Sequence, residues 1–122
     1  MVAKASTKRT NKRVSKLRIN LSAIVYREGK FWIAHCLELD IVAEGASPDD
    51  AMAALISLCD LQIRVALEES DLESIFRPAP PEIWKLFASG NPLRLPSRKR
   101  ARNGQPFNSP VDRFEARELA LT

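Results

Sequence analysis

The side chains of this sequence that could perform chemistry are one histidine, two cysteines and a group of carboxylates. His35 and Cys36 are adjacent and therefore suggest a nucleophile with its base. Adjacent residues of a β-strand point to opposite faces, so these two cannot form a catalytic dyad. The alternative nucleophile, Cys59, lies among apolar residues of a predicted helix. We therefore expect both cysteines to be small core residues and His35 to be a surface residue of a strand.

Metal, phosphate and dinucleotide chemistry also lack a recognisable pattern here. One histidine and two widely separated cysteines do not have the paired ligand spacing of structural zinc sites. No phosphate-binding loop, nucleophile elbow or dinucleotide fingerprint is present. We predict that the chain is not an enzyme and requires no metal or other cofactor.

Five carboxylates cluster in the sequence between residues 38 and 50. Asp49 and Asp50 follow Ser47-Pro48 and are explained as the first turn of a helix, because Ser47 can cap the backbone and the acids suit the helix dipole. A metal or acid–base site built from the whole cluster is therefore the weaker interpretation. The remaining three acids are candidates for contact with a partner: Glu38, Asp40 and Glu44.

Three strands should precede this helix. Residues 17–27 alternate between apolar and polar, which is typical of a strand with one buried face. Residues 27–30 predict a hairpin turn, and 31–36 and 41–43 predict two further strands. The last strand ends at Gly45, where we expect a backbone conformation closed to other residues. Short connections predict an antiparallel meander, with Trp32 packed beside Cys36 over the helix.

The helix from Pro48 to about Glu69 has two apolar rows. The first contains Ala51, Leu55, Leu58, Gln62 and Val65, and the second contains Met52, Ile56, Cys59, Ile63 and Leu67. A helix on a three-stranded sheet needs only one buried stripe, so the extra width predicts another packing partner. This partner is either a later helix or another subunit. We expect a homodimer or higher homo-oligomer that forms through Ile56 and Ile63.

One stretch of the chain resembles a known family. Gly29 is followed by Trp32-Ile33-Ala34-His35-Cys36-Leu37-Glu38-Leu39 and then by Ala43-Glu44-Gly45-Ala46-Ser47-Pro48-Asp49-Asp50-Ala51. This pattern, within residues 17–68, resembles HicB-like antitoxin domains, in which a strand ends in Cys-Pro-Glu-Leu and a later one in a Gly-x-[Ser/Thr]-x-x-[Glu/Asp]-Ala helix start. Leu37 stands where the family usually has proline, so the turn after Cys36 is open to difference.

The resemblance implies a partial ribonuclease-H-like α+β fold. Its elements would be a three-stranded antiparallel meander, a long helix on one face, a second short helix and a closing C-terminal strand. The expected organisation is a basic arm over 1–16, the domain over 17–90, a basic Pro/Gly loop over 91–109 and a closing strand, or alternatively a short helix, over 110–122. After Gly90 no pair of amphipathic helices suggests a DNA-binding domain, so the chain resembles a stand-alone member.

Charge is segregated along the chain, although the net charge is only +4. Residues 1–18 contain seven Lys/Arg and no acid, whereas residues 19–93 contain five basic and twelve acidic side chains. An acidic domain suits a basic partner, and the resemblance implies an antitoxin that neutralises a small basic ribonuclease. The alternative is nucleic-acid binding through the basic arms, with Arg98, Lys99, Arg100 and Arg102 as phosphate contacts.

No membrane attachment is expected. No apolar run reaches the roughly 20 residues that a transmembrane helix needs, and no secretory signal is recognisable. Two cysteines at unrelated positions do not suggest a disulfide framework, which agrees with a reducing compartment. We therefore expect a cytoplasmic protein.

Overall fold

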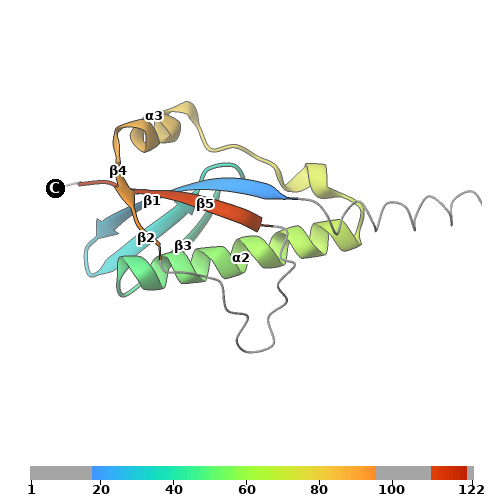
Figure 1. Cartoon of the computed structure of the whole chain (residues 1–122), viewed down its shortest axis with the longest axis horizontal. Helices are drawn as coiled ribbons and strands as arrows, with labels where there is room; N and C mark the ends of the chain where they lie inside the picture. The colour runs from blue at the N-terminus through green and yellow to red at the C-terminus, as the bar shows by residue number, and fades with distance from the viewer. Residues whose placement is uncertain (1–17, 96–110, 121–122) are drawn as a thin grey trace, which may run out of the picture.

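A five-stranded mixed sheet with one helix against each face organises the chain (Figure 1). The computed structural model describes residues 18–95 and 111–120, so the predicted basic arm and most of the predicted basic loop lie outside it. The elements in chain order are β1 (Ile19–Glu28), β2 (Phe31–Cys36), β3 (Ile41–Gly45), α2 (Pro48–Glu68), the 3₁₀ turn η1 (Leu72–Ile75), α3 (Pro81–Ser89), β4 (Asn91–Leu93) and β5 (Val111–Glu118). The α+β fold predicted from the sequence is confirmed.

The sheet has the strand order β3-β2-β1-β5-β4. The first three strands form the predicted antiparallel meander, in which Ala34 of β2 lies between Val25 of β1 and Ala43 of β3. Gly29 in the first hairpin has φ +65°, the left-handed conformation that glycine adopts without strain. The closing strand β5 pairs with β1 in the parallel direction.

One short strand differs from the prediction. Residues 91–93 were predicted as loop but form β4, which pairs antiparallel with β5. Three residues are too few to show an alternating pattern in the sequence, and Pro92 argues against a strand. This strand exists because β5, whose paired residues lie 23 to 27 positions later in the chain, offers it an edge for hydrogen bonding.

Helix α2 covers the inner face of the sheet and encloses the larger core. Its start agrees with the prediction, since the Ser47 hydroxyl accepts a hydrogen bond from the Asp50 backbone N–H at 3.1 Å. Gly45 is needed for a reason other than the one expected. Its φ is not positive, but a Cβ at this position would lie 2.5 Å from the Ala51 nitrogen. Glycine therefore allows α2 to approach the end of β3 closely.

Helix α3 covers only part of the outer face. A second core lies beneath it, formed by Ile24, Leu37, Ala79 and Leu119 with Ile83, Trp84 and Phe87 packed against them. The guanidinium of Arg117 in β5 donates to the carbonyls of Phe87 and Ala88 at the end of α3, at 3.2 and 3.3 Å. A cation at the C-terminus of a helix is favourable, so this contact fixes α3 on the sheet.

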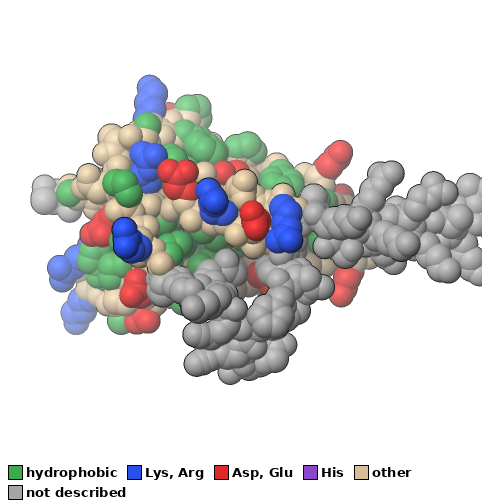
Figure 2. Space-filling view, viewed as in Figure 1, with side chains coloured by type: hydrophobic (Ala, Val, Ile, Leu, Met, Phe, Trp, Pro, Cys, Tyr) green, Lys and Arg blue, Asp and Glu red, His purple; other side chains and the backbone are tan. Residues whose placement is uncertain are grey.

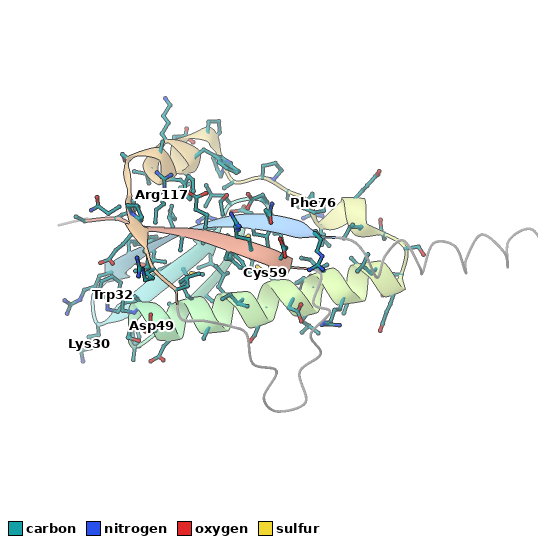
Figure 3. All side chains as sticks on the ribbon, viewed as in Figure 1. Lys30, Trp32, Asp49, Cys59, Phe76 and Arg117 are labelled. Carbon is teal, nitrogen blue, oxygen red and sulfur yellow. The ribbon has the colours of Figure 1, made fainter. Side chains whose placement is uncertain are left out.

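Trp32 lies at the margin of the inner core rather than within it. Its side chain is half-buried and packs against the core, whereas Ala34 and Cys36 on the same face of β2 are fully buried. Figure 3 shows Trp32 at the end of the sheet where α2 begins, close to the first hairpin. The predicted inner face is therefore correct, but the tryptophan is less enclosed than expected.

Candidate functional site

The turn after β2 brings together most of the residues that the sequence singled out. Leu37 and Leu39 are buried, and the Leu37 N–H donates to the Ser22 carbonyl at 2.9 Å. Its own carbonyl accepts a hydrogen bond from the Ala79 N–H at 2.7 Å. Proline, which HicB-like domains usually have here, could not donate the first of these bonds. The turn therefore depends on the residue that departs from the family pattern.

Glu38, the first predicted partner-binding residue, is occupied within the fold. One carboxylate oxygen accepts the Ser22 backbone N–H at 2.7 Å, and the other accepts the Ser22 hydroxyl at 2.9 Å. Hydrogen bonds to a charged group are stronger than those between neutral groups. Glu38 therefore holds the turn to β1, and its carboxylate is not a free surface group.

Asp40 is paired with the histidine on the outer face of the sheet. Its Oδ1 lies 2.6 Å from His35 Nε2, and its φ of +55° places it in the left-handed region. The His35 side chain is only 12% exposed and that of Asp40 is 46% exposed. Cys36, the neighbour of His35, belongs to the inner core, so the two side chains lie on opposite faces as the strand pattern predicts.

Glu44 is the predicted acid that remains open to a partner. It lies exposed on β3, beside Ile33 of β2 in the strand register. Val42, two residues earlier on the same face, is 51% exposed, and Phe31 in β2 is 52% exposed. We call the surface formed by Phe31, Ile33, His35, Val42 and Glu44 the open face.

The open face exists because α3 packs over β1 and not over β2 and β3. Sequence reasoning did not find its apolar members. The available signal was that Phe31 and Ile33 are apolar and alternate with Trp32 and Ala34, so β2 is apolar on both faces. Elsewhere on the surface, positive and negative side chains are mixed. On the side shown in Figure 2, acidic and basic side chains alternate without a large patch of one sign.

The two cysteines lie against each other in the inner core. Both are buried free thiols, Cys36 on β2 and Cys59 on α2, where Figure 3 labels Cys59. A hydrogen bond with Cys36, followed by burial, raises the pKa of the Cys59 thiol far above its ordinary value. A protonated and enclosed thiol is a poor nucleophile. Within residues 18–95 and 111–120, no group of three His, Cys, Asp or Glu side chains is placed to hold a metal ion.

The two residues predicted to mediate self-association do not lie on a free surface. Ile63 is 0% exposed and belongs to the inner core, and Ile56 is half-buried against the same core. Ile63 therefore stabilises the chain's own fold and Ile56 does so in part, so the self-association expected through them stays a prediction for which Ile63 has no exposed surface. The row that contains them faces the sheet. The exposed apolar side chains of α2 are instead Leu58, Leu61 and Val65, which come from the other flank of the helix.

The predicted nucleic-acid contacts Arg98, Lys99, Arg100 and Arg102 lie outside the described residues. In the part that the structure describes, no helix is both long and apolar enough to span a membrane. No family profile, curated protein or solved structure matches this chain.

Proposed function

We propose that this chain is a protein-binding module of the antitoxin type, which binds a small basic ribonuclease toxin and blocks its RNA-cleaving surface. The observation that carries the proposal is the open face, where exposed apolar side chains lie beside Glu44 on two neighbouring strands. Exposed apolar groups with charged neighbours are typical of protein interaction sites. The role is one of binding, without catalysis by this chain.

Charge supports a basic partner. All fifteen acidic residues of the chain lie within the described residues, together with nine of the nineteen Lys/Arg. The folded part therefore has an excess of negative charge. An acidic surface accelerates association with a basic protein, and this effect weakens as salt is added.

The test starts from the reading frames that flank the gene of this chain. Each flanking product is expressed alone in bacteria, while growth and RNA integrity are measured. Any product that arrests growth is then expressed together with this chain. We expect one small basic product to degrade RNA and the chain to relieve the arrest. If no flanking product is toxic, or if the chain does not relieve the arrest, the proposal is wrong.

A charge reversal on the open face locates the contact. Glu44→Lys should slow association with the toxin and flatten its dependence on salt, as measured by stopped-flow fluorescence. Glu68→Lys is the matched control, because it makes the same change of charge at an exposed position at the far end of α2. Equal effects of the two variants would remove the open face from the proposal and leave only the overall charge.

Nucleic-acid binding is the second candidate, because ten of the Lys/Arg lie in two segments of the sequence, 1–17 and 96–110, that contain no acid. Neutralising Arg98, Lys99, Arg100 and Arg102 with serine should leave toxin binding unchanged in the antitoxin proposal. Loss of the only detectable binding, with RNA or DNA as a steeply salt-dependent ligand, would favour the second candidate instead.

A further inference from the structure

The two edges of the sheet differ in their capacity to pair with another strand. At one edge, β4 has only three residues and includes Pro92, which has no N–H to donate. At the other edge, β3 has five residues, contains neither proline nor lysine, and pairs with β2 without a register shift. Proteins usually protect an exposed edge strand with proline, lysine or a short length, because the unpaired backbone groups of the edge can otherwise pair with a further strand. Within residues 18–95 and 111–120, β4 is therefore protected against further strand pairing and β3 is not.

Helix α2 presents exposed apolar side chains on the same side of the molecule as β3. In Figure 1, α2 runs from left to right below the sheet, with β4 and β5 toward the viewer and β3 behind. Successive residues of an α-helix are about 100° apart, so Ile56 and Asp60 lie on one flank of the sheet-facing residues of α2, and Ala54 and Leu58 lie on the other. In a right-handed helix that runs in this direction below the sheet, the flank with Ala54 and Leu58 is the one on the β3 side. Leu58 is 38% exposed there.

We propose that two copies of this chain associate through antiparallel pairing of their β3 strands, which joins the two five-stranded sheets into one. This inference goes beyond the proposed function and does not depend on it. A two-fold axis perpendicular to the sheet makes the two β3 strands antiparallel and places both α2 helices on the same face. The open faces also meet on the opposite side, so the dimer would present one wider surface.

Charge selects the register of this pairing. When the axis passes through Ala43, Val42 of each copy lies opposite the partner's Glu44, and no two acids face each other. A register centred one residue earlier would place Asp40 opposite the partner's Glu44. A register centred one residue later would place Glu44 opposite the partner's Glu44. Like charges directly opposite each other destabilise strand pairing, so the Ala43 register is favoured.

The spacing of the elements allows the two helices to touch in this arrangement. Helix α2 packs mainly on β3 and β2, and strands lie about 4.8 Å apart. A helix axis above these two strands is therefore roughly 5 Å from the two-fold axis, and the two α2 axes are about 10 Å apart. Packed helices have this separation. The strand pair is too short by itself to bury the roughly 800 Å² per partner of a stable interface. The contact between the two α2 helices would add to the buried area.

The level of the axis along α2 identifies which apolar residues take part. Gly45 lies against Asp50 and Ala51, and Ala43 is two residues, or about 6.6 Å, further along β3. This distance corresponds to about four helical residues, so Leu55 lies level with the axis. Leu58 then faces the first turns of the partner's α2. Val65 lies past the partner's Pro48, where the partner helix begins, and makes no contact.

Sedimentation equilibrium of the full chain at micromolar concentrations tests the proposal, with circular dichroism as the control for folding. The wild type should be a dimer. Val42→Glu places an acid opposite the partner's Glu44, twice in the dimer, and should weaken association roughly tenfold or more. Val42→Lys, at the same exposed position, places a cation opposite Glu44 and should leave the dimer intact. The double variant Val42→Glu/Glu44→Lys should restore it.

A second pair of variants tests the helix contact. Leu58→Glu should weaken the dimer, whereas Val65→Glu, on the same exposed flank, should not. A monomeric wild type overturns the proposal. This holds even if β3 pairs with a strand of a different protein. A dimer that responds equally to Val42→Glu and Val42→Lys overturns the register and with it the β3 interface. If Val65→Glu acts as strongly as Leu58→Glu, the interface is a helix pair and not the strand pair proposed.

Discussion

Replacing Glu38 by alanine tests whether this carboxylate serves the fold or a partner. The sequence suggested a partner, but in the structure both oxygens accept hydrogen bonds from Ser22. Alanine removes both acceptors and leaves the Ser22 backbone N–H, in a partly buried setting, without its bond. The variant should therefore be less stable whether or not a partner is present.

The size of the effect follows from the two bonds. A hydrogen bond to a charged group contributes about 1.5–3 kcal/mol when its loss leaves a buried partner unsatisfied. Ser22 is only half-buried, so water replaces part of the loss. We expect Glu38→Ala to lower the free energy of unfolding by about 2–3 kcal/mol. With a urea m-value of roughly 2 kcal/mol per molar, the midpoint should fall by about 1 M or slightly more.

Urea unfolding followed by tryptophan fluorescence, at one fixed protein concentration, measures this change. Ser22→Ala and the double variant complete a cycle, in which the hydroxyl and the carboxylate should be coupled by about 1 kcal/mol. Glu44→Ala is the matched surface control and should change stability by no more than about 0.5 kcal/mol. If Glu38→Ala changes stability as little as this control, the carboxylate is free in solution and our account of the turn is wrong.

Three further predictions concern the turn, the tyrosine and the thiols. Leu37→Pro should lower stability by about 2–4 kcal/mol in urea unfolding, because it removes a backbone donor and a buried side chain; an unchanged midpoint would contradict the bond to Ser22. Tyr26 is the chain's single tyrosine, and burial followed by the charge of Glu28 raises its pKa above 10.0. Ultraviolet titration should therefore give a midpoint above pH 10.0. Because the folded state holds the phenol proton more tightly than the unfolded state, stability should fall as the pH rises above 10.0. A midpoint at or below 10.0 would contradict the burial of Tyr26. The two cysteine thiols should resist a disulfide reagent in the native protein and react on unfolding, and rapid native reaction would contradict their enclosure.

Local features of the sequence determined the starts and ends of several elements. Ser47-Pro48 and Asp50 predict the start of α2 because a helix cap involves residues only three apart. The alternation over residues 17–27 and the turn at Gly29 likewise predict β1 and its hairpin, because strand period and turn chemistry are local properties. In each case the interacting groups are neighbours in sequence, so the pattern contains the physical cause.

The candidate site depended on contacts between residues far apart in the chain. Glu38 is sixteen residues from Ser22, and no local pattern shows that its carboxylate turns back to β1. The exposure of Val42 depends on where α3 lies on the sheet. The acids of the site are therefore visible in the sequence, but only the fold distinguishes Glu44, which is exposed, from Glu38, whose carboxylate is hydrogen-bonded to Ser22.

By itself, the sequence determined that the chain forms an α+β domain with a meander followed by a long helix, because hydrophobic period and capping are properties of neighbouring residues. Only the tertiary structure decided how much of each apolar row of α2 is buried, because the position of the sheet selects the covered side of the helix. Leu55 of the first row and Ile63 of the second belong to the core, whereas Leu58 and Val65 of the first row are exposed. It also decided that residues 111–118 form a strand, because their propensity allowed a helix and the free edge of β1 supplied the backbone partners.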